Sequence, residues 1–190
     1  MASQFQHDKL QAMFAAFDAD SDGYLRADDF EALAARWGQL SGVEPGTELR
    51  ARVEEVCRGW WRTLLAAADT NRDDTVNMSE LLAVVDQLPT MREEVAATAD
   101  TIFDAVDTDK DGRISPTEHQ LLVETWHGQP LDTREIFPLL DHDGDGYLTR
   151  AEFATLWTQF WISDDAAEPG NQVCGRIPGQ RSGSPASSPA

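Results

Sequence analysis

Cysteine, long apolar runs and positive charge are all scarce in this chain of 190 residues. The two cysteines, Cys57 and Cys174, provide neither a disulfide framework nor a zinc-ligand spacing. No apolar run approaches the length of a membrane-spanning helix. The first residues hold no basic-then-apolar signal, and Ala2 stands where myristoylation needs glycine. We therefore expect a cytoplasmic chain without membrane association.

Basic residues number 15 against 34 acidic ones, which gives a net charge of −19. A field of that sign disfavours nucleic acid and anionic membranes as partners. Histidine is also rare, and its members show no ligand or triad spacing with cysteine or serine: His7, His119, His127 and His142. His119 lies on an apolar helix face, where a satisfied core histidine is expected. We therefore predict that the chain is not an enzyme.

Four acidic segments share one spacing: residues 18–29, 69–80, 107–118 and 141–152. Each carries Asp or Asn at positions 1, 3 and 5 and a carboxylate at position 12, which is the pattern of an EF-hand calcium loop. Ca²⁺ takes about six to eight oxygen ligands, and a short loop supplies them only by curling around the ion. Position 7 contributes its backbone C=O, so its side chain is free to vary.

This pattern assigns the metal ligands residue by residue. In loops 18–29, 107–118 and 141–152 they are Asp18, Asp20, Asp22, Tyr24, Asp29, Asp107, Asp109, Asp111, Arg113, Glu118, Asp141, Asp143, Asp145, Tyr147 and Glu152. In loop 69–80 they are Asp69, Asn71, Asp73, Thr75 and Glu80. Carboxylates at ligand positions account for 15 units of negative charge, so site chemistry explains most of the acidity.

Loop 18–29 departs from the pattern twice. Asp29 at position 12 is one methylene shorter than Glu, which favours a single gripping oxygen and the lower coordination number that Mg²⁺ prefers. Arg26 at position 9 cannot accept a hydrogen bond from a coordinated water. We predict a weaker Ca²⁺ site here, with Mg²⁺ as a competitor.

Loop 69–80 departs at the turn. Position 6 needs a positive φ and is usually glycine, but here it is Asp74, for which strain of about 1–2 kcal/mol is expected. Asn71 also removes one formal charge from the ligand set. We rank this site as the weakest of the four.

The residues one, four, five and eight positions before each first aspartate and after each position 12 are apolar except for Thr133 and His119, which defines helix faces with a period near 3.6. The repeat predicts an all-α fold of four helix–loop–helix units. Position 8 is apolar throughout (Leu25, Val76, Ile114 and Leu148), which indicates a short antiparallel bridge between paired loops. A long helix is expected over 47–68, and the Leu88-Pro89-Thr90 segment predicts a break rather than a continuous central helix.

These signals divide the chain into three parts. Residues 1–88 hold the first pair of units, residues 89–162 hold the second pair, and the Gly/Ser/Pro-rich residues 163–190 predict a disordered tail that includes Cys174. The six tryptophans are expected in the core. Cys57 is expected to be partly buried in the long helix.

The arrangement resembles the sarcoplasmic calcium-binding proteins and, more closely, the bacterial calerythrin-like proteins. The resemblance covers about residues 5–161 and rests on the long interval between the first two loops, on the opening Phe17-Asp18-Ala-Asp20, and on Arg26-Ala-Asp28-Asp29-Phe30. It implies a compact fold with two EF-hand pairs around a shared core. It further implies metal binding in loops one, three and four, a degenerate second loop, and cytosolic calcium buffering or transport.

Two functions remain open at this point. A monomeric Ca²⁺ buffer is favoured because methionine is scarce, whereas calmodulin-like sensors expose flexible Met-rich grooves. The alternative is a Ca²⁺ sensor that exposes an apolar groove to a protein partner, which the six tryptophans and eight phenylalanines would be able to line.

Overall fold

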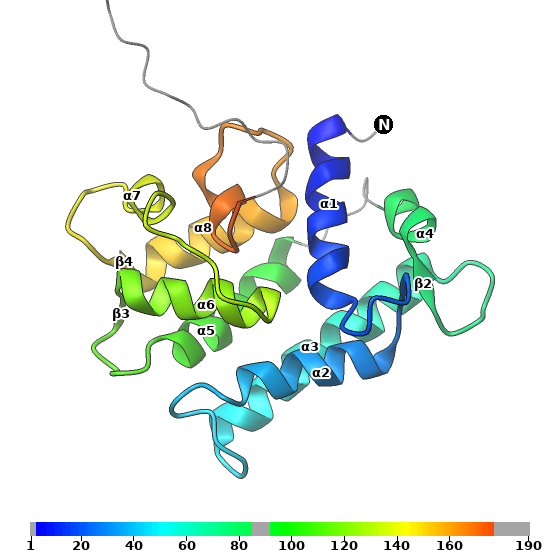
Figure 1. Ribbon diagram of the computed structural model, residues 1–190, viewed down its shortest axis with the longest axis horizontal. Coiled ribbons are helices and arrows are strands. Elements are labelled where there is room, and N and C mark those ends of the chain that lie inside the picture. The colour runs from blue at the N-terminus through cyan, green and yellow to red at the C-terminus, as the bar shows by residue number, and fades with distance from the viewer. Residues whose placement is uncertain (1–2, 85–91, 177–190) are drawn as a thin grey trace, which may run out of the picture.

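The computed structural model describes residues 3–84 and 92–176, and this part of the chain is mainly α-helical (Figure 1). The helices are α1 (Gln4–Phe17), α2 (Ala27–Trp37), α3 (Glu48–Ala68), α4 (Met78–Ala83), α5 (Arg92–Val106), α6 (Pro116–His127), α7 (Phe137–Leu140) and α8 (Arg150–Ile162), followed by the 3-10 helix η2 (Pro169–Gln172). The strands are β1 (Tyr24–Leu25), β2 (Val76–Asn77), β3 (Arg113–Ile114) and β4 (Leu148–Thr149). The all-α prediction with short bridges is confirmed.

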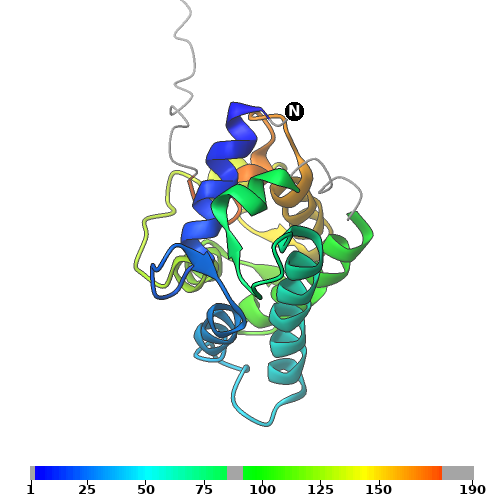
Figure 2. The same ribbon diagram turned by 90° about the vertical axis from the view of Figure 1, so that its right-hand side faces the viewer.

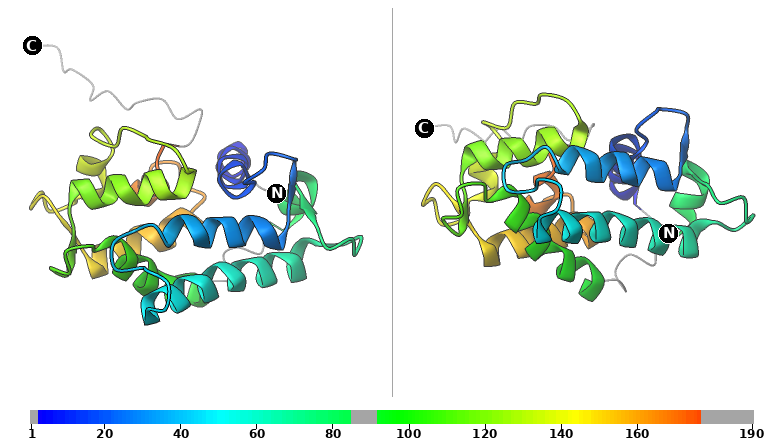
Figure 3. Two further views of the ribbon diagram at one scale, coloured as in Figure 1. Left: turned by 60° about the horizontal axis from the view of Figure 1, so that its bottom comes forward. Right: turned by 90° about the horizontal axis from the view of Figure 1, so that it is seen from below.

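The four short strands form two antiparallel bridges. β1 pairs with β2 so that Leu25 faces Val76, and β3 pairs with β4 so that Ile114 faces Leu148. These are the four apolar position-8 residues, and all four are fully buried. The two bridges lie at opposite ends of the molecule, with the helices between them (Figures 1 and 3). Each bridge fixes two acidic loops side by side.

The helices that leave the loops begin at the capping residue in position 9. Ser115, Thr149 and Asn77 each accept a hydrogen bond from the backbone N–H of position 12. In return, each position-12 carboxylate accepts the N–H of the cap, which completes a capping box. The last residue of each loop is therefore also the third residue of a helix. The Thr47 side chain accepts the N–H of Arg50 and caps α3 without a capping box, and α3 confirms the predicted long helix.

One core joins the two predicted pairs. The apolar positions that flank the loops are buried almost throughout, and they belong to a single cluster. At its centre lies an aromatic cluster drawn from five helices: Phe17, Phe30, Trp60, Trp126, Trp157, Phe160 and Trp161. The ring of Trp60 on α3 lies 6.0 Å from that of Trp126 on α6 and 5.5 Å from that of Trp161 on α8. Aromatic pairs at such distances stabilise the contact beyond simple burial. Figure 2 shows α3 and α1 beside the helices of the second pair.

Two features differ from the sequence-based expectations. The helix that leads into loop 141–152 has only the four residues of α7, because Pro138 has no N–H and fits only the first turn of a helix. The tail is ordered as far as residue 176: η2 packs on α8, and Val173, Cys174 and Asn171 are buried. Disorder is therefore wrong for residues 163–176, which we call the strap. The predicted break at 88–90 and residues 177–190 lie outside the described residues.

The remaining burial agrees with expectation in most places. Five of the six tryptophans are buried, and Trp60 is partly buried against the same cluster. Cys57 is more deeply buried than expected, at 1% exposure, and burial raises the pKa of its thiol to about 12. Among the described residues, no helix combines the length and apolar character that spanning a bilayer requires.

Candidate metal-binding loops

The four acidic loops share one internal hydrogen-bond frame. The position-1 aspartate accepts the backbone N–H of position 6 at 2.9–3.2 Å. The position-3 side chain accepts the N–H of position 5 at 3.0–3.2 Å. The position-5 aspartate accepts the N–H of position 7 at 2.8–3.0 Å. The backbone therefore turns the three predicted ligand side chains toward the middle of each loop.

Two positions in each loop adopt a left-handed backbone. Position 6 has φ of 86°, 83° and 87° at Gly23, Gly112 and Gly146, and 58° at Asp74. Position 4 is also left-handed, with φ of 59–62° at the non-glycine residues Ser21, Arg72 and Lys110 and 73° at Gly144. The strained position 6 of the second loop is as predicted. The strain at position 4 was not predicted, although a glycine at that position in one of the four repeats was a usable signal.

The carboxylates converge in three of the loops. Within the described residues, three groups place one oxygen per residue within 4.8 Å of one another. They are Asp18, Asp20 and Asp22; Asp107, Asp109 and Glu118; and Asp141, Asp143 and Asp145. Loop 69–80 is fully described and forms no such carboxylate group; Asn71 stands where the other loops have their position-3 aspartate. Only in loop 107–118 is the position-12 carboxylate already a member of the cluster.

In loops 18–29 and 107–118, the position-12 carboxylate closes the loop onto its own beginning. The Glu118 carboxylate accepts the N–H of Thr108 at 2.8 Å through one oxygen and the N–H of Ser115 at 2.9 Å through the other. Asp29 spans the corresponding positions, accepting from Ala19 at 3.0 Å and from Arg26 at 2.7 Å. The shorter side chain therefore still reaches both anchors. Whether it grips a metal through one oxygen remains a prediction.

Burial and crowding perturb these carboxylates. Burial raises the pKa of Asp107, and the neighbouring charges of Glu118 and Asp111 act in the same direction. Burial also raises the pKa of Asp29. Glu118 differs: burial raises its pKa, but hydrogen bonds from Ser115 and Thr108 outweigh burial and leave the pKa below its usual value. Like charges held this close favour either a proton or a bound cation.

Loop 18–29 contains a cation of its own. The Arg26 guanidinium at position 9 forms a hydrogen-bonded ion pair with Asp22, the predicted position-5 ligand, and it also lies 5.4 Å from the centre of the Tyr24 ring. The hydrogen bond from Arg26 lowers the pKa of Asp22. From the sequence, Arg26 was identified only as a residue that cannot accept a hydrogen bond from a coordinated water. Its contact with a ligand carboxylate is visible only in three dimensions.

The position-7 residues place their backbone in the bridges or beside them. Tyr24 and Arg113 lie in β1 and β3, while Thr75 and Tyr147 directly precede β2 and β4. Arg113 reaches across to the partner loop, where its guanidinium lies 3.9 Å from an Asp145 carboxylate oxygen and 5.3 Å from the Tyr147 ring centre. The second pair of loops is thus linked by a charge contact as well as by its bridge.

The converging side chains offer oxygen donors alone, without nitrogen or sulfur. Hard divalent cations such as Ca²⁺ and Mg²⁺ prefer this donor set, whereas zinc and other transition metals favour imidazole or thiolate. Crowded carboxylates on a hydrogen-bonded backbone frame fit such an ion in loops 18–29, 107–118 and 141–152. Loop 69–80 has the same frame with one carboxylate fewer.

Paired helix–loop–helix units with acidic twelve-residue loops define a protein of the EF-hand class. A family model described as an EF-hand domain pair matches residues 99–158, and a second EF-hand domain-pair model matches residues 1–36. Neither range includes loop 69–80. The chain belongs to the EF-hand superfamily and resembles the sarcoplasmic calcium-binding proteins.

Three individual proteins illustrate the likeness. Sarcoplasmic calcium-binding proteins I, III and IV of Branchiostoma lanceolatum are 25% identical over 189 residues, covering 93% of this chain and 99% of theirs. The calcium-binding allergen Ole e 8 of Olea europaea is 28% identical over 167 residues, covering 85% and 88%. A solved calcium-binding protein of Streptomyces coelicolor superposes with a TM-score of 0.67 at 22% identity, covering 85% and 99%.

Proposed function

We propose that this chain is a monomeric cytosolic Ca²⁺ buffer or transport protein. Loops 107–118 and 141–152 provide its strongest sites, loop 18–29 a moderate site at which Mg²⁺ competes, and loop 69–80 the weakest. The observation that carries the proposal is the shared hydrogen-bond frame, which turns the position-1, position-3 and position-5 side chains toward the middle of every loop. A frame that fixes the ligand side chains in this manner lowers the cost of binding.

Burial of the apolar helix faces favours the buffer over the sensor. The faces that a sensor would open are packed into the aromatic cluster between the two pairs. Among the described residues, the exposed large apolar side chains are Tyr24, Leu139 and Tyr147, and two of these three lie in the metal loops. They do not form a contiguous helix face for a partner to bind.

A binding function without catalysis also agrees with the histidines of α6. The Nε2–H of His119 donates to the carbonyl of Val173 at 3.0 Å, and that of His127 donates to the carbonyl of Cys174 at 2.7 Å. Burial lowers the pKa of His119 to about 4, so this residue is neutral at physiological pH. Both side chains therefore have a structural role, because each hydrogen-bonds to a backbone carbonyl of residues 173–174.

Calorimetric titration with Ca²⁺ in millimolar Mg²⁺ tests the proposal. Glu118→Gln and Glu152→Gln should each remove one tight site and leave the others, because each glutamate closes a different loop. An unchanged number of tight sites in both variants would refute the ligand assignment. Binding of an apolar fluorescent dye then separates the two functions: a flat or falling signal on adding Ca²⁺ supports the buffer, and a large rise supports the sensor.

A further inference from the structure

The strap, residues 163–176, lies directly on the second pair of units. After α8 ends at Ile162 the chain turns back, and η2 packs against α8 and α7 (Figure 1). Gly170 approaches α8 so closely that a Cβ on it would lie 2.4 Å from the Leu156 carbonyl oxygen and 2.5 Å from Gln159 Cβ. Only glycine fits there without displacing the strap. The Gln159 side chain also accepts the N–H of Gly170 at 3.1 Å.

Buried polar groups tie the strap to α1 and α6. Lys9 of α1 is 1% exposed, and its ammonium donates to the Ser163 carbonyl and, at 3.2 Å, to Asn171 Oδ1. Asn171 is itself fully buried and donates to the carbonyls of Asp165 and Glu168. His119 and His127 of α6 donate hydrogen bonds to the carbonyls of Val173 and Cys174. Hydrogen bonds from buried polar groups favour one arrangement of the strap, although the buried Nδ1 of His119 has no hydrogen-bond partner.

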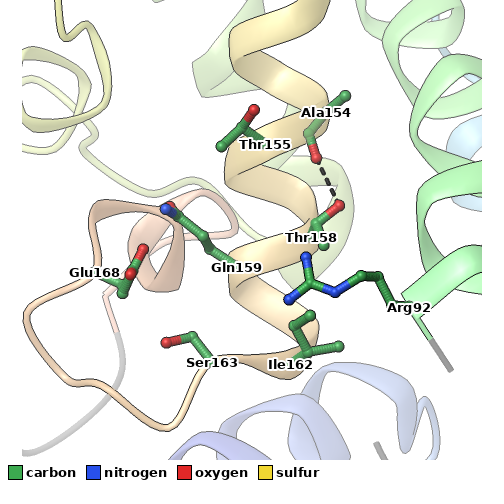
Figure 4. Close-up of a pocket in the computed structure, with 8 residues that line it drawn as sticks. All are labelled: Arg92, Ala154, Thr155, Thr158, Gln159, Ile162, Ser163 and Glu168. Atoms are coloured by element: carbon green, nitrogen blue, oxygen red, sulfur yellow. Dashed lines mark hydrogen bonds between the residues drawn. The ribbon is translucent and has the colours of Figure 1, made fainter. Parts of the chain in front are cut away.

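The inner side of the strap completes the apolar core. Val173 is fully buried and Cys174 is 3% exposed, and both belong to the same cluster as the aromatic residues. The space between Cys174, Trp126 and Phe160 amounts to about 10 Å³, which leaves room for at most one water. On the outer side, Ser163 and Glu168 line an open pocket of about 520 Å³ along α8, whose lining is both polar and apolar (Figure 4). The strap therefore separates solvent from the core of the second pair.

Helix α6 connects the strap to a metal loop. Its third residue is Glu118, the position-12 residue of loop 107–118, and the next residue, His119, hydrogen-bonds to the strap. A sensor-type opening would have to swing α6 away from α8 and α1. The strap bonds to all three helices and resists that movement.

We propose that residues 163–176 occupy the surface that an opened second pair would offer to a partner, and thereby keep that pair closed when Ca²⁺ binds. This inference rests on the proposed function, since it explains why Ca²⁺ binding leaves the apolar core covered. The occupant is this chain's own strap, and displacing it exposes a surface around Trp126 and Phe160 suited to an apolar helix.

Two truncated chains test the proposal through apolar-dye fluorescence with and without Ca²⁺. A chain ending at residue 162 lacks the strap, and a chain ending at residue 176 keeps it as the matched control. We expect a severalfold Ca²⁺-dependent rise in fluorescence for the first, and none for the second or for the full chain. If the chain ending at 162 binds as many Ca²⁺ ions as the full chain and shows no rise, the proposal is overturned.

Gly170→Ala keeps the test decisive if the shorter chain does not fold. The added methyl should push η2 from α8 and expose Cys174 to a thiol reagent, with the same Ca²⁺-dependent dye signal. Gly59→Ala on α3 is the control, because its Cβ would meet only Arg62 Nη2, at 4.0 Å. A protected Cys174 or an absent dye signal in Gly170→Ala contradicts the proposal, as does a reactive Cys174 in the Ca²⁺-loaded full chain. Calorimetry that detects no Ca²⁺ binding to the full chain refutes the proposed function instead.

Discussion

Single backbone positions decide how the four loops differ. Asp74 has φ of 58° at the position where the other three loops have glycine with φ between 83° and 87°. A left-handed conformation costs a residue with a Cβ about 1–2 kcal/mol, although Asp tolerates it better than most. The hydrogen bond from its N–H to Asp69 is also the longest of the four equivalents, at 3.2 Å. Loop 69–80 therefore has the same design with a strained turn.

Asp74→Gly should relieve this strain and raise the Ca²⁺ affinity of loop 69–80, the stability of the metal-free fold, or both, by about 1 kcal/mol in total. Calorimetry and urea unfolding measure the two parts. Asp74→Asn is the matched control, because it removes the charge but keeps the side chain and most of the strain. Equal behaviour of the Gly and Asn variants would mean that turn strain is not what weakens this loop.

Arg26 acts at the same scale through charge. Its guanidinium neutralises Asp22, which a metal needs at position 5, so an incoming cation must displace it. Arg26→Gln should raise the Ca²⁺ affinity of loop 18–29 a fewfold at low salt, and the gain should shrink as salt rises because the ion pair is exposed. Arg62→Gln, which removes an exposed arginine paired with Glu55 on α3, is the control. A gain that is the same in both variants would reflect net charge rather than this contact.

At the scale of elements, α6 shows how loop closure and helix initiation depend on the same residues. The Ser115 hydroxyl donates to the Glu118 carboxylate at 2.9 Å and accepts the Glu118 N–H at 3.3 Å. Ser115→Ala should therefore cost about 1 kcal/mol of stability through the lost cap and also weaken Ca²⁺ binding in loop 107–118. Ser115→Thr keeps the hydroxyl and should preserve both properties. Loss of stability with unchanged Ca²⁺ affinity would show that the cap does not orient Glu118.

The sequence predicted the helices that flank the loops and the bridges between paired loops, because short-range residue patterns determine both. The apolar offsets located the helices and position 8 located the bridges, because these signals act within a few residues. The strap was misread because its composition is that of a linker. Its order comes from Lys9, His119 and His127, which are far away in sequence. Likewise, the contact between Arg26 and Asp22 depends on a rotamer, which spacing does not specify.

For the whole molecule, charge and packing act in opposition until metal binds. The net charge is −19, and carboxylates at ligand positions contribute most of it, while the helices between the two loop ends share one apolar core. Crowded carboxylates repel one another in the metal-free protein and reduce its stability. Ions that bind only the native state stabilise it by mass action, by roughly 4 kcal/mol per site at a concentration a thousandfold above the dissociation constant.

The metal-free protein should therefore gain stability from added KCl, since salt screens the same repulsion that Ca²⁺ removes. Urea unfolding in chelator should show the midpoint rising with KCl, whereas the Ca²⁺-saturated protein should show a much smaller response. Glu152→Gln provides the internal comparison: it removes one charge from the crowded set and should raise metal-free stability while reducing the gain on adding Ca²⁺. A salt response of equal size with and without Ca²⁺ would mean that the repulsion lies among the other surface charges rather than in the loops. Metal binding would then not stabilise the fold by relieving that repulsion.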